Sequence, residues 1–190
     1  MKKILIATKN KDKFAVITKI LDKISKESYE YYSLYDIENL TKNDKEEGDI
    51  ESRAYNKAKQ VYLSIKENDF EYIIGIDDGI KMKGMLRENV KDYIEEIVND
   101  KYLINGEQVE IIRAYCFINK MGKCKILKTE IPFKYKKYDG KMKIEENSYP
   151  LSNVLCPIDS DKVVAEIDEN ENNEYYLKYS ENVIKEAFIW

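Results

Sequence analysis

Residues 1–13, MKKILIATKNKDK, join a short apolar strand to the start of a helix. The apolar run Ile4–Ala7 predicts a buried strand, the polar turn Thr8–Asn10 follows it directly, and Lys13 stands one turn into the helix. The backbone N–H groups and positive dipole end of a helix start favour an anion, and Lys9 and Lys13 can add charge-assisted hydrogen bonds to phosphate oxygens. The stretch therefore predicts a first strand–helix unit, which either binds phosphate or only carries solvated lysines.

Helix and strand patterns alternate beyond this unit. Apolar residues recur at helical spacing over Lys11–Ser25 and again in a second helix from Ile50 to Ile65, and a tyrosine-rich strand, Tyr29–Tyr35, is expected between them. The short apolar run Tyr72–Ile76 predicts a buried strand that ends at Asp77-Asp78-Gly79.

The rest of the chain predicts a helix, a long antiparallel hairpin, a strand and a final helical turn. These are expected at Glu88–Val98, at Val109–Asn119 with Lys125–Tyr135, at Val163–Ile167 and at Val183–Phe188. The order predicts an α/β protein: a mixed twisted sheet flanked by helices, with an antiparallel hairpin extension, in a single domain over residues 1–190.

Composition limits the chemistry. The 190 residues include no histidine, which excludes Ser-His and Cys-His nucleophiles and His-ligated metals, so carboxylates and lysines must carry any reaction. Such oxygen ligands suit Mg²⁺ or Mn²⁺.

The net charge and the hydropathy of the chain bear on its partners. A net charge of -4 gives no global preference for nucleic acid, and no apolar segment approaches the length of a membrane span. We therefore expect no nucleic-acid partner, no membrane partner and a cytoplasmic location. The three cysteines, Cys116, Cys124 and Cys156, lack a C-x-x-C pair and are expected to be buried small hydrophobes.

Two acidic clusters are candidate metal ligands. Glu46-Glu47-Gly48 precedes the second helix, and Asp77-Asp78 follows the short apolar strand. Ligands in α/β sheets bind beyond the carboxyl ends of strands, so one cleft could join Asp77-Asp78 to Thr8-Lys9-Asn10 and hold a metal-bound triphosphate. A solvated charged loop and a polar turn are the alternative interpretations of the two clusters.

Four motifs in order resemble the inosine triphosphate pyrophosphatase (Ham1-like) family. They are Thr8-x-Asn10-x-x-Lys13, Glu46-x-Gly48, Ala54-x-x-Lys57-Ala58 and Asp77-Asp78-Gly79-Ile80. The resemblance implies an elongated α/β homodimer with two lobes around a nucleotide cleft. It also implies Mg²⁺-dependent hydrolysis of nucleoside triphosphates, chiefly of deaminated purines, to the monophosphate and pyrophosphate.

The resemblance also implies a role for each matching residue. Thr8, Asn10, Lys13 and Ser180 would bind the substrate, and Lys9 joins them because of its charge at the helix start and not because of the motif. Lys57 would face the phosphates, and Asp78 would orient the metal or activate the attacking water. The implied metal ligands are Glu46 and Asp78, and Asp77 is added as a third candidate because it is adjacent to Asp78.

The chain departs from the family at its base-reading motifs. Arg53 replaces an Asn of the second helix, and no Ser follows Asp78. The stretch Tyr149–Asn153 lacks the aromatic-Asp-Pro core of its counterpart, and of the family's S-H-R motif only Ser180 is kept. Two hypotheses follow: a Mg²⁺-dependent nucleoside triphosphate pyrophosphatase with altered or relaxed base specificity, or a catalytically degenerate nucleotide-binding or dimeric interaction protein of the same fold.

Overall fold

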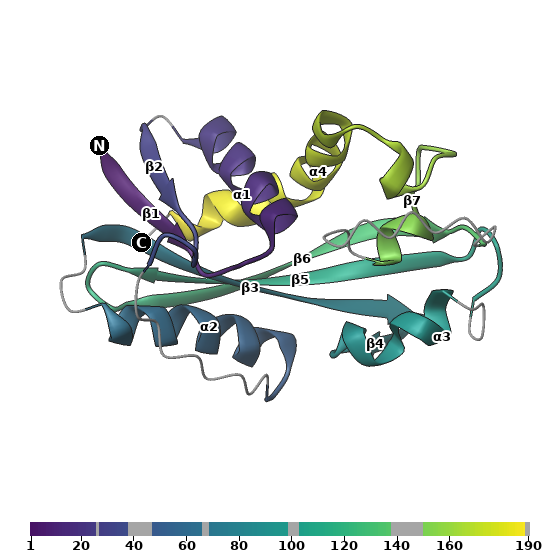
Figure 1. The fold of residues 1–190 in the computed structure, drawn as a ribbon, viewed down its shortest axis with the longest axis horizontal. Helices are drawn as coiled ribbons and strands as arrows, with labels where there is room; N and C mark the ends of the chain where they lie inside the picture. Colours follow the sequence, from purple (N-terminus) through teal and green to yellow (C-terminus); the bar gives the residue numbers. More distant parts are fainter. Residues whose placement is uncertain (26, 38–46, 66–68, 99–102, 138–149, 189–190) are drawn as a thin grey trace. The chain divides into compact units, whose positions relative to one another are not determined.

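The computed structural model describes the chain except residues 26, 38–46, 66–68, 99–102, 138–149 and 189–190 (Figure 1). The strands are β1 (Lys2–Ile6), β2 (Tyr29–Tyr32), β3 (Phe70–Met82), β4 (Met85–Arg87), β5 (Gln108–Asn119), β6 (Cys124–Tyr135) and β7 (Leu155–Pro157). The α-helices are α1 (Lys11–Ile24), α2 (Ile50–Ser64), α3 (Ile94–Val98) and α4 (Glu169–Ala187). Short 3-10 turns are η1 (Val90–Tyr93), η2 (Pro150–Asn153) and η3 (Val164–Glu166). No helix within these described ranges is long and apolar enough to cross a membrane.

The strands form a mixed sheet in the order β2-β1-β3-β5-β6-β7, with β4 paired to β3. β1 runs parallel to β2 and to β3, whereas β3 and β4 pair antiparallel, as do β6 and β7. A mixed α/β sheet flanked by helices is what the alternation of sequence patterns predicted, and the prediction is confirmed.

The chain divides into two compact units, and both are assembled from separate stretches of sequence. Unit 1 contains Met1–Asp77, Arg113–Thr129 and Leu177–Trp190, and unit 2 contains Asp78–Ile112 and Glu130–Tyr176. Three strands, β3, β5 and β6, therefore contribute residues to both units. The single domain over 1–190 and the nucleotide cleft between two lobes stay predictions.

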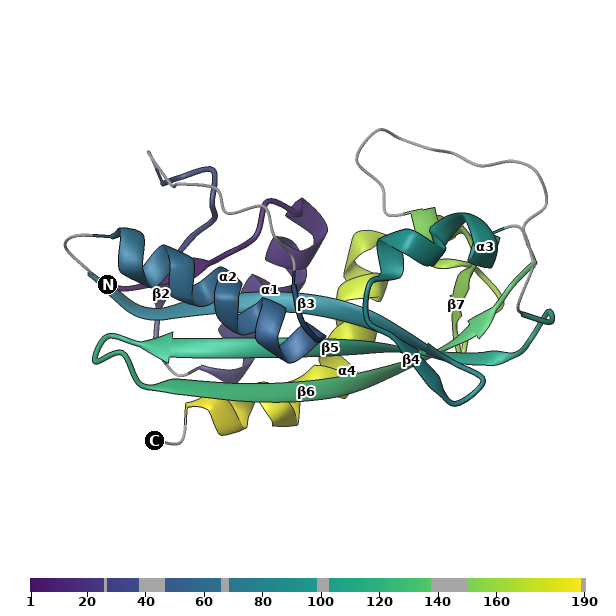
Figure 2. The same ribbon diagram turned by 90° about the horizontal axis from the view of Figure 1, so that it is seen from below.

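Unit 1 carries helices on both faces of its strands. α1 and the last part of α4 lie on one face, and α2 lies on the other (Figures 1 and 2). Ile4, Leu5 and Ile6 of β1 have no exposed surface, since β1 lies between β2 and β3 and helices cover both faces. The amphipathic pattern of α1 buries Val16, Ile17, Ile20 and Leu21 as expected for a helix that packs along one stripe.

Unit 2 contains β4, the short helices and turns, and the start of α4. α3 and η3 both contact η2, and β7 contacts η2 and η3. The start of α4 is fastened to the unit 2 part of β6, where the Tyr175 hydroxyl donates to the Pro132 carbonyl oxygen and the Tyr175 ring packs on Phe133.

Several element predictions are wrong. The strand at Tyr72–Ile76 does not end at Asp77 but continues as β3 to Met82, because Ile80 to Met82 pair with β4. Val163–Ile167 is not a strand but surrounds the 3-10 turn η3, whose Glu166 carboxylate accepts the Val163 N–H.

The helix expectations near Glu88–Val98 and Val183–Phe188 also need correction. In the first region only η1 and the short helix α3 form. The residues before it, up to Arg87, belong to β4. The second region is the end of α4, a helix that starts at Glu169. The first part of this helix is too polar for an apolar pattern to have predicted it.

Candidate functional site

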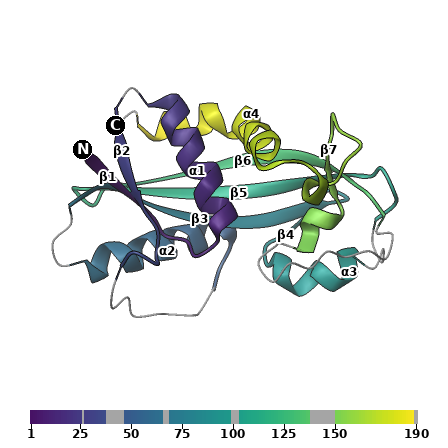
Figure 3. The same ribbon diagram turned by 45° about the horizontal axis from the view of Figure 1, so that its top comes forward.

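A short turn joins β1 to α1 (Figure 3). Two of its own side chains stabilise this turn. Asn10 is the N-cap of α1: its Oδ1 accepts the Lys13 N–H at 2.9 Å, which satisfies one of the unpaired donors of the first turn. Thr8 Oγ1 accepts the Asn10 N–H at 3.1 Å. Thr8 and Asn10 therefore fix the turn, and the amide N–H group of Asn10 is the part of that side chain suited to donate to an anion. Lys9 is exposed and Lys13 half-buried at the same helix start.

Asp77 is held by two cations from one face of α2. Arg53 Nε lies 2.5 Å from Asp77 Oδ2, and Lys57 Nζ lies 2.6 Å from Oδ1. The two cations are four residues apart on α2 and therefore share a helix face. The side chains of Arg53 and Asp77 are 5% and 10% exposed, whereas that of Lys57 is 28% exposed. Both carboxylate oxygens are thus paired, and Lys57 is the member of the cluster that reaches solvent.

The close approach of α2 to β3 depends on Gly75. A Cβ atom at Gly75 would lie 1.9 Å from the Ala54 carbonyl oxygen and 2.9 Å from the Ala58 nitrogen. Ala54 and Ala58 are the small, fully buried residues that α2 turns toward the strand. Gly75 and the two alanines let the helix backbone lie against the sheet, which places Arg53 and Lys57 within reach of Asp77, two residues along β3.

Arg53 also stabilises the turn that precedes α2. Its Nη1 donates to the Gly48 carbonyl oxygen at 3.0 Å. Gly48 has a φ of 93°, a left-handed conformation that favours glycine, and the N-cap Asp49 accepts the Ser52 N–H at 2.7 Å. That backbone hydrogen bond lowers the pKa of the Asp49 carboxyl. One guanidinium therefore links the Gly48 turn to the β3 carboxylate.

Asp78 points away from this cluster. Consecutive side chains of a strand leave opposite faces, and both aspartates lie inside β3, so Asp78 leaves the face opposite to Asp77. The expectation that the two aspartates stand together after the end of a strand is wrong, because β3 continues through them.

The donor set of the predicted metal site fits only in part. Asp77 does not fit a metal ion, because a cation already occupies each of its oxygens. Asp78 is a half-buried carboxylate of the kind that Mg²⁺ uses alone or in pairs, together with substrate phosphates. Glu46 lies outside the described residues. Within the described ranges, no three His, Cys, Asp or Glu side chains gather in a group able to hold a metal ion.

Ser180 is enclosed in unit 1. It has no exposed surface, and its Oγ accepts the Tyr115 hydroxyl at 3.2 Å. Beside it on α4, the Tyr179 carbonyl oxygen accepts the Thr129 hydroxyl at 2.7 Å. These bonds give Ser180 a packing role against β5, and its contact with substrate stays a prediction.

Arg53 is the residue whose role the sequence did not reveal. Its place in the family motif marked it only as a departure. The available signal was its four-residue spacing from Lys57, which puts two cations on the face of α2 that also carries the buried alanines. A cation buried on a helix face, as Arg53 is, requires a carboxylate from the sheet beneath it.

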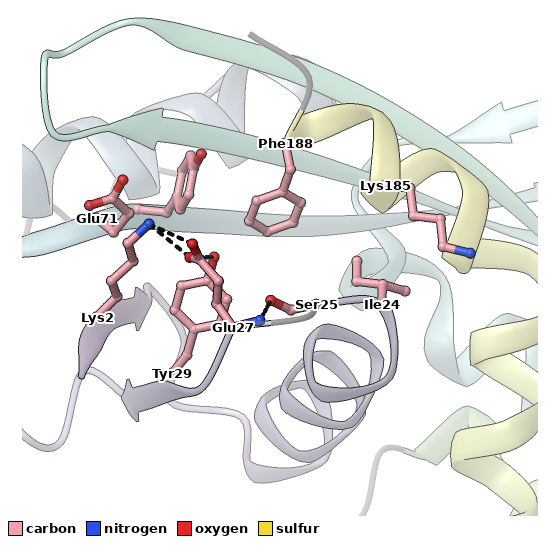
Figure 4. A pocket seen from close by; sticks show the side chains of 9 residues that line it. Lys2, Ile24, Ser25, Glu27, Tyr29, Glu71, Lys185 and Phe188 are labelled. Carbon is pink, nitrogen blue, oxygen red and sulfur yellow. Dashed lines mark hydrogen bonds and ion pairs between the residues drawn. The ribbon is translucent and has the colours of Figure 1, made fainter.

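A pocket of about 340 Å³ lies at the other end of β1, beside the end of α1 and the last turn of α4 (Figure 4). Its lining includes three aromatic rings and an ion pair between Lys2 and Glu27 at 2.8 Å. Its second lysine, Lys185, is paired with Glu181 of the preceding turn. No predicted site residue lines this pocket, and its paired lysines do not form a set of cations suited to a triphosphate.

Solved structures of two Ham1 proteins and of a nucleoside-triphosphatase share this fold over nearly the whole chain. The Ham1 protein of Staphylococcus aureus superposes with a TM-score of 0.65 at 16% identity, covering 99% of this chain and 98% of that one. A HAM1 protein from Coxiella burnetii gives a TM-score of 0.63 at 12% identity, with 98% and 96% covered. A nucleoside-triphosphatase, named a dITP/XTP pyrophosphatase, from Mycobacterium abscessus gives 0.57 at 14% identity, with 90% of each chain covered.

The chain therefore has the fold of the Ham1 proteins, as its sequence motifs predicted. No protein-family model and no curated protein matches the sequence. The likeness is to the fold alone at these identities, so activity has to be argued from the side chains.

Proposed function

We propose that this protein is a Mg²⁺-dependent nucleoside triphosphate pyrophosphatase with altered or relaxed base specificity. The observation that carries the proposal is the partly exposed Lys57, fixed on Asp77 within the fold of the Ham1 structures. A lysine held in one position by a buried carboxylate is suited to stabilise phosphate charge, which is the main requirement of phosphoryl-type displacement.

Phosphate binding in this proposal belongs to the first strand–helix unit. The start of the 14-residue helix α1 favours an anion, and Lys9 and Lys13 stand at that start. The Thr8 hydroxyl and the Asn10 amide group would add neutral donors from the turn that they shape. Lys57 would bind a phosphate oxygen from α2.

The reaction would be attack of water on the α-phosphorus, with cleavage of the bond to the bridging oxygen of the β-phosphate. Asp78 would orient the water and accept its proton, and the products would be the monophosphate and pyrophosphate. In the alternative role, Asp78 would hold Mg²⁺ together with Glu46 instead of accepting the proton. When bound, Mg²⁺ supplies neutralisation of phosphate charge and a lower pKa for a coordinated water.

The test is pyrophosphate release from a panel of natural and non-canonical nucleoside triphosphates with Mg²⁺, beside an Asp78→Asn variant. Turnover that Asp78→Asn abolishes would support the enzyme, and the preferred base would show what replaces the family's base-reading motifs. Turnover that survives in Asp78→Asn would contradict the role given to Asp78. A homodimer is part of the proposal and is tested by the mass in light scattering.

A second candidate is a nucleotide-binding protein without turnover. The observation that favours it is the pairing of both Asp77 oxygens with Arg53 and Lys57, which removes a carboxylate from the predicted metal site. In that case nucleotides would raise the melting temperature, since ligand that binds only the folded state stabilises it, while no member of the panel would release pyrophosphate.

A further inference from the structure

We propose that Arg53 sets the charge of the phosphate site: it neutralises Asp77, so that the positive charge of Lys57 acts on a bound polyphosphate instead of being cancelled by the strand carboxylate. The inference rests on the proposed function in one respect, since it concerns the same anion site. It makes Arg53 a positioning residue, because the side chain is buried and acts through Asp77 and Lys57.

The geometry of the cluster carries this assignment. The Asp77 carboxylate has one cation on each oxygen, Arg53 at 2.5 Å and Lys57 at 2.6 Å. Two cations and one carboxylate leave one net positive charge among the three side chains. Arg53 is 5% exposed and Lys57 is 28% exposed, so the member able to meet an anion is Lys57.

The choice of arginine fits this role. A guanidinium stays charged when buried and offers several donors in one plane, whereas a buried lysine loses its charge more easily. Arg53 uses this capacity twice, with Nε on Asp77 and Nη1 on the Gly48 carbonyl oxygen at 3.0 Å. The second bond fixes the guanidinium beside Asp77 and also ties the turn before α2 to β3.

Without Arg53, Asp77 would pair with Lys57 alone, and one negative charge would cancel one positive charge. The family motif has Asn at this position, so Arg53→Asn changes the charge of the cluster while restoring a side chain that the family carries there. The same variant leaves an oxygen of Asp77 for another cation. Loss of anion affinity and gain of cation affinity should therefore occur together.

The experiment measures binding of inorganic pyrophosphate by calorimetry, with a chelator and no divalent metal. Arg53→Asn should bind pyrophosphate at least about tenfold more weakly, the size of one lost charge-assisted interaction. The double variant Arg53→Asn with Asp77→Asn restores one net positive charge through Lys57 and should recover wild-type affinity to within about threefold. Lys128→Asn is the matched control: it removes a cation paired with Glu51 on the exposed surface of unit 1, and affinity should not change.

Wild-type affinity in Arg53→Asn, or a double variant as weak as Arg53→Asn, would overturn the inference. If Arg53→Asn does not fold, the double variant and Asp77→Asn still test the inference. The charge argument predicts that the double variant binds pyrophosphate as tightly as the wild type. It also predicts that Asp77→Asn binds pyrophosphate at least as tightly as the double variant. The opposite order would overturn it. These measurements need no turnover, so a silent nucleotide panel would contradict the proposed function and leave the charge pattern of binding intact.

Discussion

The packing of α2 on β3 gives a sharp stability prediction at Gly75. An alanine there would bring its Cβ to 1.9 Å from the Ala54 carbonyl oxygen, whereas ordinary contact begins at 3.4 Å, so the helix must move away by about 1.5 Å. The obstacle is backbone, and shortening the Ala54 side chain cannot remove it. Such a shift separates the buried face of α2, which includes Ile50 and Val61, from the sheet. Overpacking of this kind costs roughly 3 kcal/mol, a large part of the roughly 5–15 kcal/mol that stabilises a typical domain.

Urea unfolding of Gly75→Ala should therefore show a lower midpoint with an unchanged slope. Gly106→Ala is the control, because Gly106 has a positive φ of 86° but nothing within 4 Å of an added Cβ. The control should lose only about 1 kcal/mol, the cost of a side chain in left-handed backbone. Equal losses in the two variants would refute the reasoning, since contact with the Ala54 carbonyl oxygen would then add nothing to the cost of the substitution.

Three further predictions concern single side chains. Asn10→Asp keeps the oxygen that caps α1, so the melting temperature should hold, but its negative charge should weaken pyrophosphate binding in calorimetry; unchanged affinity would place the anion elsewhere. The pKa of Asp49 is lowered by the backbone hydrogen bond from Ser52, so the stability it contributes is present above its unfolded pKa and is lost as pH falls through its folded pKa. Between about pH 6 and about pH 3, the wild-type melting temperature should fall further than that of Asp49→Asn, and parallel curves would contradict this assignment. Iodoacetamide should modify the exposed Cys124 before the buried Cys116, whose thiol pKa is raised by burial, as peptide mass spectrometry can follow; the reverse order would refute it.

Local patterns were sufficient for the parts of the fold that pack along one face. The periodicity of α1 and α2 and the paired apolar runs of β5 and β6 correspond closely to the observed elements, because burial on one side imposes a regular spacing. The order of the phosphate and carboxylate motifs likewise predicted the fold that the solved Ham1 structures share.

The errors occurred where tertiary pairing decides the local structure. Nothing in Asp77-Asp78-Gly79 signals a strand, and polar residues of this kind usually end one. The strand continues because α2 supplies two cations to Asp77 and β4 pairs with the residues beyond Gly79. Cys124 was expected to be buried, but it opens β6 at the exposed end of the hairpin. The α2 partner is remote, since Lys57 lies 20 residues before Asp77, and no local pattern contains that contact. The β4 partner is local: the two-residue turn Lys83-Gly84, in which both residues have positive φ, is a hairpin signal that the sequence prediction did not use.

The division of each unit among distant stretches of sequence has a consequence for how the protein must fold. Unit 1 begins with β1 but also needs the strand residues from Arg113 and the helix residues from Leu177. Its first hundred residues therefore leave the ribosome without β5 and α4, whose buried Tyr115 and Ser180 are hydrogen-bonded to each other in this unit. Contacts this far apart along the chain form slowly, because a long loop must close before any of them is made. We expect an incomplete chain to depend on chaperones until α4 has been synthesised, and neither unit to survive as an excised fragment.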